Sequence, residues 1–360
     1  MMDVEVGMAL FRTMAAEGHE AVAFFSDPSV GLRCVIAIHD TTLGPALGGT
    51  RMWPYATEAE ALTDALRLSK AMTYKAALAG LDLGGGKAVI IGDPARDKTE
   101  ALLRAYGRAV DSLGGRYITA SDVGTTPQDL EIIMQETRWM LGRPRESGGS
   151  GDSAPATAYG VLQAMHACAD DAFGDPSLSG RTVVIQGFGK VASNLARRLK
   201  DEGAELVVAE IASRARDRAA EEFHARIVAP DEIFDVEGDI FAPCALGGVL
   251  NDSTIPRLRC RIVAGSANNQ LAERADADRL EAAGILYAPD YAINAGGIIN
   301  LSFELAKYEP EIAMARVAKI HDTMAQVIAI AKNERLTTAA AADWLAEARL
   351  SAARAMAPRA

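Results

Sequence analysis

Short apolar runs rich in β-branched residues mark three strands in the first part of the chain. Two are continuous, at Cys34–His39 and Lys87–Ile91, and a weaker one covers Arg116–Thr119. Runs of this length bounded by glycine-rich turns are typical of strands. A helix is predicted between the first two strands, because Thr57-Glu58-Ala59-Glu60 is a capping box. It extends to about Ala79, and one of its faces carries Leu62, Leu66, Ser69 and Thr73.

The second part of the chain alternates between helix and strand. The pattern predicts a helix at about Thr157–Asp170, a strand at Thr182–Gln186, a glycine turn, a helix at about Val191–Asp201 and a strand at Glu205–Glu210. This alternation indicates an α/β fold with a doubly wound parallel sheet. Further strands are expected at Asp239–Phe241, Ile262–Ala264 and Ile285–Ala288, and helices at about Glu311–Asn333 and Thr337–Met356.

A stretch rich in glycine, serine and proline, Arg143–Ala156, is the best linker candidate, because these residues do not sustain a helix. We therefore expect a domain boundary there, and 360 residues suit two domains of roughly 150 residues each. In the last predicted helix Trp344 and Leu345 lie on an apolar stripe, which we expect to pack in the core.

Charge and cysteine content narrow the class of protein. The formal charge of −11 disfavours nucleic acid and anionic membranes as partners. The start of the chain does not resemble a signal peptide, no apolar run reaches the roughly 18 residues of a membrane span, and four scattered cysteines fit no disulfide framework. We expect a soluble cytoplasmic protein. The five histidines show no metal-ligand spacing, so no metal is predicted.

The glycine turn after the strand Thr182–Gln186 has the pattern of a dinucleotide-binding loop. Gly187-Phe188-Gly189-Lys190-Val191-Ala192 matches G-x-G-x-x-G/A between a strand and a helix, the context in which the pattern is informative. Glu210, at the end of the next strand, can accept hydrogen bonds from an adenosine ribose and would repel a 2′-phosphate. This favours NAD over NADP, although Arg214 and Arg216 offer an alternative phosphate site.

Candidate chemistry also lies in the first part of the chain. Lys75 is near the end of the first helix, and Lys87 follows three glycines, Gly84 to Gly86, which suggest a close approach of chain and ligand. Partial burial would lower the pKa of Lys87 towards the range useful for proton transfer. On residue type alone, an ordinary surface lysine is the favoured interpretation of each. Asp122 also fits an Asx turn, and Gly48-Gly49-Thr50-Arg51 fits a turn with or without a bound anion.

Several blocks together resemble the Glu/Leu/Phe/Val dehydrogenase family, and within it the leucine dehydrogenase branch most closely. They follow the family order over nearly the whole chain: GPALGGTRMWPY (44–55), LRLSKAMTYKAALAGLDLGGGKAVIIGDP (66–94), YITASDVGTT (117–126), the dinucleotide turn, FAPCALGGVLND (241–252), GSANNQL (265–271) and NAGGIINL (294–301).

The resemblance implies NAD-dependent oxidative deamination of an L-amino acid to a 2-oxo acid and ammonia, and the reverse reaction. It assigns the substrate carboxylate to Lys75 with the backbone of Gly48 and Gly49, and catalysis to Lys87 and Asp122. Water activation by Lys87 and proton transfer by Asp122 suit the chemistry that follows hydride loss from Cα. The residues it assigns to the cofactor are Gly187, Phe188, Gly189, Lys190, Val191, Ala192, Ser193, Glu210, Cys244, Ala245, Asn268 and Asn269.

The implied architecture is an N-terminal α/β catalytic domain, residues 1–145, completed by residues 336–360, and a Rossmann-type NAD-binding domain, residues 146–335, with the substrate in the cleft between them. In this family the substrate side chain is held by positions that match Leu47, Ala120, Ile298 and Leu301. All four are apolar, so a glutamate side chain would be buried without a partner, at a cost of several kcal/mol.

The apolar pocket favours leucine, valine or isoleucine without ranking them. Phenylalanine dehydrogenase is the alternative enzyme, and it needs space that Ala120 and Ile298 are expected to occupy. A silent NAD-binding regulator is the alternative outside enzymes, which the presence of Lys75, Lys87 and Asp122 disfavours. Relatives form homo-oligomers, so one is expected here.

Overall fold

The computed structural model describes residues 4–356, and side chains from residue 10. The chain divides into two compact units. Unit 1 runs to Gly151 and takes in Glu304–Tyr308 and the chain from Ala346, whereas unit 2 comprises Asp152–Phe303 and Glu309–Leu345. The sequence predicts a boundary near residue 145 and places the whole last helix in the first domain. In the structure that helix passes from unit 2 to unit 1 at residues 345 and 346.

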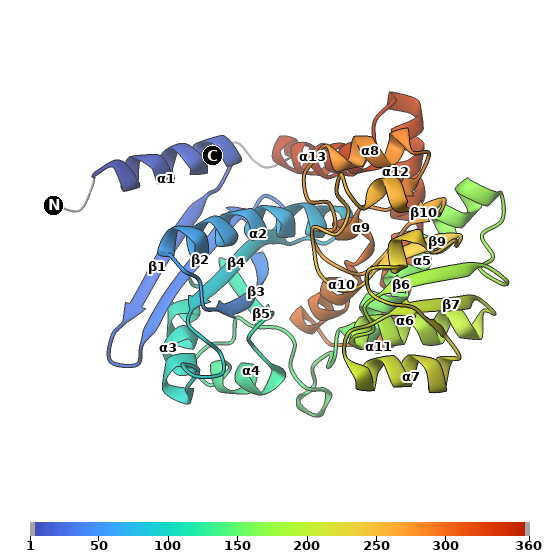
Figure 1. The fold of residues 1–360 in the computed structure, drawn as a ribbon. Coiled ribbons are helices and arrows are strands. Elements are labelled where there is room, and N and C mark those ends of the chain that lie inside the picture. The colour runs from blue at the N-terminus through green and yellow to red at the C-terminus, as the bar shows by residue number, and fades with distance from the viewer. Residues whose placement is uncertain (1–3, 357–360) are drawn as a thin grey trace. The chain divides into compact units, whose positions relative to one another are not determined.

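Unit 1 is built on a five-stranded mixed sheet of order β1-β2-β4-β3-β5 (Figure 1). β1 and β2 are antiparallel, β2 and β4 are antiparallel, and β3 runs parallel to both β4 and β5. The strands are β1 (Ala21–Asp27), β2 (Leu32–Asp40), β3 (Ala46–Trp53), β4 (Gly84–Ile91) and β5 (Tyr117–Ser121). The helices are α1 (Val4–Glu17), α2 (Glu58–Leu78), α3 (Glu100–Asp111) and α4 (Pro127–Ile133), with a 3₁₀ turn at Arg145–Ser147.

Both faces of this sheet are buried, which explains why its central strands are continuously apolar. Alternate residues of a strand point to opposite faces. Even-numbered residues such as Ile36 and Ile90 join the core under α3 and α4, while Val35 and Val89 pack with Leu66 of α2. The predicted capping box begins α2, since the Thr57 hydroxyl accepts the Glu60 N–H at 3.1 Å.

Two predictions for this unit were incomplete. The apolar pattern does not indicate β1. Gly48–Arg51 have the composition of a turn, whereas in the structure these residues lie inside β3. Glycine usually weakens a strand. Here, however, a Cβ on Gly48 would lie 1.7 Å from the carbonyl oxygen of Gly86, so only glycine allows β3 and β4 to approach this closely.

Unit 2 contains a six-stranded parallel sheet of order β11-β10-β9-β6-β7-β8 (Figure 1). The first strand is central and the chain winds outward on both sides, as in doubly wound folds that bind dinucleotides. The strands are β6 (Thr182–Gln186), β7 (Glu205–Ala209), β8 (Arg226–Ile227), β9 (Ile240–Pro243), β10 (Ile262–Val263) and β11 (Leu286–Tyr287). The predicted doubly wound sheet is therefore present, with β8 as a strand that the pattern did not reveal.

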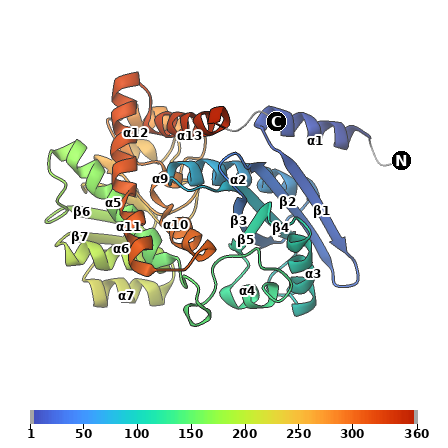
Figure 2. The same cartoon turned by 180° about the vertical axis from the view of Figure 1, so that it is seen from behind.

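Helices pack around this second sheet, and α5 lies beside α6 and α12 (Figure 2). They are α5 (Ala154–Phe173), α6 (Lys190–Asp201), α7 (Ser213–Phe223), α8 (Asp276–Ala282), α9 (Asp290–Ile293), α10 (Gly296–Ser302), α11 (Pro310–Ala318), α12 (Ile320–Glu334) and α13 (Thr338–Met356), with 3₁₀ turns at Ile233–Asp235, Ile255–Arg257 and Phe303–Leu305. The single helix expected at Glu311–Asn333 is two helices that meet at Lys319. None of the described helices is long and apolar enough to cross a bilayer.

The expected core position of Trp344 was wrong, because its side chain is 51% exposed. The stretch Arg143–Ala156 does contain the boundary between the two units, after Gly151, as the sequence predicts. It is nevertheless well anchored, because α5 begins at Ala154 and Ser150 is fully buried. The Glu304 carboxylate fixes this stretch, because it accepts hydrogen bonds from the backbone N–H groups of Gly142 and Ser150 at 3.2 and 2.7 Å.

Candidate active site

Lys87 and Asp122 form a buried ion pair in unit 1. Lys87 lies in the middle of β4, its side chain is 7% exposed, and its Nζ donates to Oδ2 of Asp122. Asp122 follows β5, with a side chain that is 24% exposed. The structure therefore brings together the two side chains that the sequence analysis singled out for catalysis.

Burial and charge act against each other in this pair. Burial lowers the pKa of Lys87, as the sequence analysis expected, and the Asp122 carboxylate opposes that change. For Asp122 burial favours the neutral acid, but the charges of Lys87 and Arg51 outweigh it and hold the pKa at about 2. The pair thus combines a carboxylate that is ionised at neutral pH with an amine that burial makes easier to deprotonate, which suits acid–base catalysis near neutral pH.

The three glycines before Lys87 are required by chain packing. They form the first residues of β4 and are buried. A Cβ on Gly85 would lie 2.1 Å from the backbone nitrogen of Thr73, and one on Gly86 would lie 2.7 Å from the Tyr117 ring. Their absence of side chains lets α2 and β5 pack directly against the strand that carries Lys87.

The candidate substrate residues of unit 1 share one face of the sheet. Strand alternation places Lys87 on the same face as Gly85, which lies against α2. Leu47 pairs with Gly85 in register and is 1% exposed, and Ala120 pairs with Gly49 and is 5% exposed. Lys75 belongs to the last turn of α2 and is half-buried.

Gly49 explains how Asp122 comes so close to β3. A Cβ on Gly49 would lie 2.9 Å from Cβ of Asp122 and 2.7 Å from the carbonyl oxygen of Ser121. Glycine at this position therefore makes room for the carboxylate, besides any role of its backbone in binding.

Sequence reasoning missed a second set of charged groups at this site. Arg51 donates from Nε to Oδ2 of Asp122 at 3.2 Å and from Nη1 to Oδ2 of Asp64 at 2.8 Å. The Tyr55 hydroxyl also donates to Asp64, at 2.5 Å. The signal was present in Arg51, but its interpretation as a turn residue concealed that β3 presents its side chain on the same face as Lys87.

The glycine turn of unit 2 has the shape that a dinucleotide requires. Gly187 has a φ of +85°, which favours glycine, and Gly189 is the N-cap of α6. A Cβ on Gly189 would meet no heavy atom of the described chain within 4 Å, and no described side chain caps this helix. A helix N-terminus without a side-chain cap, next to a glycine with free space around it, can bind a pyrophosphate through its backbone N–H groups. Val191 and Ser193 belong to the first turn of α6, Ala192 is buried beneath it, and Lys190 is exposed.

Glu210 comes immediately after β7 and closes this turn. Its carboxylate accepts the N–H of Phe188 at 2.6 Å and that of Ala212 at 2.8 Å. The acid is thus fixed beside the glycine turn, where a ribose hydroxyl of a bound dinucleotide would lie. The Phe188 side chain is fully buried against Phe223, so this residue can contact a cofactor only through its backbone.

The turn also lies at the point where the order of strands reverses. β6 neighbours both β7 and β9, and dinucleotides bind at the carboxyl ends of strands at such a point. Cys244 follows β9, and its N–H donates to the Gln186 carbonyl at 2.8 Å. Cβ of Ala245 lies 2.6 Å from a Cβ built on Gly187. The residues present therefore fit a nicotinamide dinucleotide.

The two candidate asparagines differ in geometry. Asn269 has a φ of +53°, and its N–H donates to Oδ2 of Asp290 at 2.7 Å. Asn268 accepts a hydrogen bond of 2.9 Å from Nδ2 of Asn294, a residue that sequence reasoning did not single out although it begins the matched block NAGGIINL. Oδ1 of Asn294 is buried and has no hydrogen-bond partner among the described residues. Ile298 and Leu301 lie one turn apart on α10 and are half-buried.

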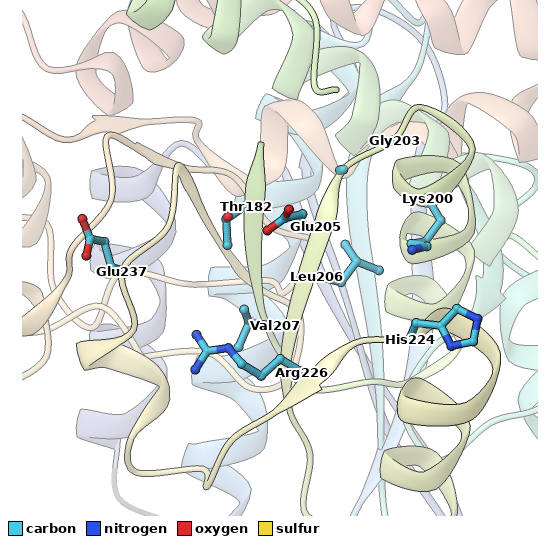
Figure 3. Close-up of a pocket in the computed structure, with 10 residues that line it drawn as sticks. Thr182, Lys200, Gly203, Glu205, Leu206, Val207, His224, Arg226 and Glu237 are labelled. Carbon is cyan, nitrogen blue, oxygen red and sulfur yellow. The ribbon is translucent and has the colours of Figure 1, made fainter. Parts of the chain in front are cut away.

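A polar groove of about 440 Å³ lies at the amino ends of the strands of this sheet (Figure 3). It is lined by Thr182, Glu205 and Arg226, which begin the parallel strands β6, β7 and β8. Because the glycine turn follows the carboxyl end of β6, this groove is distinct from the candidate cofactor site. Within the described part of the chain, no three His, Cys, Asp or Glu side chains gather to hold a metal ion.

Comparison with known families gives two matches that together span most of the chain. The model described as Glu/Leu/Phe/Val dehydrogenase, dimerisation domain, matches residues 19–139. The model described as glutamate/leucine/phenylalanine/valine dehydrogenase matches residues 148–214 and 208–357.

Individual relatives match over almost their full length. A leucine dehydrogenase of Geobacillus stearothermophilus is 55% identical over 96% of this chain and 95% of its own. A valine dehydrogenase of Streptomyces albus is 52% identical over 94% of both chains. Among solved structures, L-tryptophan dehydrogenase from Nostoc punctiforme is 46% identical and superposes with a TM-score of 0.84, covering 96% of this chain and 99% of that one.

Proposed function

The chain belongs to the Glu/Leu/Phe/Val dehydrogenase family, and we propose that it catalyses the NAD-dependent oxidative deamination of a branched-chain aliphatic L-amino acid, with the reverse reductive amination. The observation that carries this proposal is the buried pair of Lys87 and Asp122 in a chain that is more than half identical to leucine and valine dehydrogenases. A catalytically silent NAD-binding regulator would have no need for a lysine that is buried at a cost in free energy.

The nicotinamide of the bound cofactor supplies the acceptor for the hydride that leaves Cα. Lys87 in its neutral form withdraws a proton from the water that attacks the substrate carbon. Asp122, which Lys87 Nζ contacts directly, relays this proton to the departing amine and returns to the carboxylate form. These roles suit a lysine whose pKa burial lowers and a carboxylate that is ionised in its resting state.

Lys75 and the backbone of Gly48 and Gly49 are proposed to bind the substrate carboxylate. A cation at the end of α2 complements that charge. Holding the carboxylate fixes Cα against the hydride acceptor, and correct positioning accounts for much of the rate of such a reaction.

The cofactor is proposed to be NAD, bound by the turn Gly187–Ser193, Glu210, Cys244, Ala245, Asn268 and Asn269. Glu210 supports NAD over NADP, because a 2′-phosphate would meet an ionised carboxylate that is held in place by two backbone N–H groups. The cytoplasmic location stays a prediction. A homo-oligomer is also proposed, supported by the match of residues 19–139 to a dimerisation domain, and light scattering of the purified protein tests it.

Leu47, Ala120, Ile298 and Leu301 are proposed to form the pocket for the substrate side chain. Leu47 and Ala120 are apolar, buried and on the face of the sheet that carries Lys87. A glutamate side chain has no cation among these four residues, so its binding is disfavoured.

The decisive experiment is the initial rate of NADH formation from purified protein with leucine, valine, isoleucine, phenylalanine, tryptophan and glutamate, with NADP as the control coenzyme. We expect graded activity on the three aliphatic substrates, because one methylene changes binding by only about 1–3 kcal/mol. Preference for phenylalanine or tryptophan would refute the pocket assignment. Inactivity with all six substrates would favour the regulator.

A further inference from the structure

Two cations share a single oxygen atom at the candidate site. Oδ2 of Asp122 accepts from Nζ of Lys87 and from Nε of Arg51 at 3.2 Å. The side chains of Arg51 and Asp122 are 22% and 24% exposed. An arginine that only neutralised a surface carboxylate would have no reason to share its acceptor with a buried lysine.

Arg51 is held at its other end as well. Nη1 donates to Oδ2 of Asp64 at 2.8 Å, and Asp64 is 13% exposed. Asp64 in turn accepts from the Tyr55 hydroxyl at 2.5 Å and from Arg67 at 3.1 Å. The guanidinium is therefore fixed between α2 and the residue that follows β5, which gives the Asp122 carboxylate a defined position.

We propose that Arg51 is a positioning residue: it holds the Asp122 carboxylate against Lys87, and its charge favours the neutral amine of Lys87 over the ammonium. This inference rests on the proposed function for its catalytic meaning. The placement of the three groups stands independently of the substrate.

The charges around Lys87 act in known directions. Burial lowers its pKa, Asp122 raises it, Arg51 lowers it and Asp64 raises it. On the side of β2 the register partner of Lys87 is Ala37, which carries no charge. Burial works against ionisation of Arg51, but Asp122 and Asp64 outweigh it and raise its pKa, so Arg51 stays charged whenever Lys87 titrates.

The direct test is the titration of Lys87 by NMR in protein labelled with ¹³Cε-lysine, with the resonance assigned from a Lys87→Arg variant. Gln has its amide nitrogen at the chain position of Arg Nε, so Arg51→Gln can keep the hydrogen bond to Asp122 and removes only the charge. In this variant the midpoint of Lys87 is expected to move to higher pH by about one unit, because a nearby like charge is removed. Arg51→Lys keeps the charge and should stay near the wild type. Arg104→Gln, which removes a guanidinium of α3 that bridges Glu100 and Glu136, should leave the midpoint of Lys87 unchanged.

Asp64→Asn is a second variant, which should shift the midpoint of Lys87 in the opposite direction. It removes a negative charge that favours the ammonium, so the midpoint of Lys87 should fall. An Arg51→Gln protein that is folded and titrates at the wild-type midpoint or below would overturn the proposal. If Arg51→Gln does not fold, a raised midpoint in Asp64→Asn overturns it and a lowered one supports it.

The kinetic counterpart is the pH dependence of kcat/KM for deamination. Neutral Lys87 is required, so the rate should rise with pH through the pKa of Lys87, and in Arg51→Gln this rise should move to higher pH by the same amount. A purely structural loss would instead lower the rate equally at every pH. A wild-type protein without amino-acid-dependent NAD reduction would refute the proposed function, while the NMR titration would still decide the effect of Arg51.

Discussion

Glu210 is the side chain proposed to set the choice between NAD and NADP. Two backbone N–H groups hold its carboxylate beside the turn that follows β6. Because the carboxylate cannot rotate away without losing both bonds, a 2′-phosphate would be placed against a fixed negative charge. Its position one residue beyond β7 depends only on the local pattern of strand, turn and helix, which is why the sequence alone could identify it.

Glu210→Gln should therefore reduce the preference for NAD over NADP. Loss of one charge and one good acceptor changes the relative binding by about 1–2 kcal/mol, so the ratio of kcat/KM for NAD to that for NADP should fall about tenfold. Glu205→Gln, at the other end of β7, is the matched control and should keep the wild-type ratio. An unchanged ratio in Glu210→Gln would show that another group selects the coenzyme.

At the scale of elements, the contact between α2 and β4 positions Lys87. This contact exists because Gly85 has no side chain: a Cβ there would lie 2.1 Å from the Thr73 nitrogen and 2.5 Å from the Ser69 carbonyl oxygen. Both of these atoms belong to the backbone of the helix, which cannot move aside as a flexible side chain could.

Gly85→Ala should lower the free energy of unfolding by about 3 kcal/mol through overpacking. Gly189→Ala is the matched comparison, since its φ is −76° and its Cβ would meet no described atom. That variant should unfold like the wild type and lose affinity for NAD(H). Urea titration and a coenzyme-binding isotherm measure the two effects. Wild-type stability of Gly85→Ala would mean that helix and strand are not packed as described.

The elements that were predicted well are those with a local signal. The strand Thr182–Gln186 and the helix begun by the Thr57 box follow from apolar runs and capping residues. β3 could not be predicted, because its two glycines are explained only by the backbone of β4 and by Asp122, which are distant in sequence. The shared role of Arg51 was hidden for the same reason. The residues that the sequence placed at the site came from family resemblance more than from local pattern.

At the scale of the whole molecule, the chain passes between the two units at residues 151, 303, 308 and 345. Within unit 1, the Glu304 side chain holds the segment that ends at residue 151. This side chain is fully buried and accepts from backbone N–H groups of Gly142, Arg143 and Ser150, from the Ser150 hydroxyl and from the Arg143 guanidinium. A contact between residues more than 150 positions apart cannot be inferred from the composition of either segment.

Glu304→Gln should lower the free energy of unfolding by about 3 kcal/mol, because an amide nitrogen replaces an oxygen that faces only donors. Glu311→Gln, at an exposed position of α11, is the control and should change stability by less than about 0.5 kcal/mol. Chemical denaturation of the three proteins measures both values. Equal stability of Glu304→Gln and the wild type would contradict the anchoring role of this carboxylate.

Lys87 is proposed to perform acid–base catalysis in the deamination of a branched-chain amino acid. The most direct measurement is the rate at which NADH and the 2-oxo acid form together from L-leucine in wild type, in Lys87→Ala and in Lys98→Ala, whose lysine pairs with Asp129 at 2.7 Å. We predict a loss of about a thousandfold in Lys87→Ala with NAD(H) binding retained, and a near-normal rate in Lys98→Ala. A near-normal rate in Lys87→Ala would contradict the account.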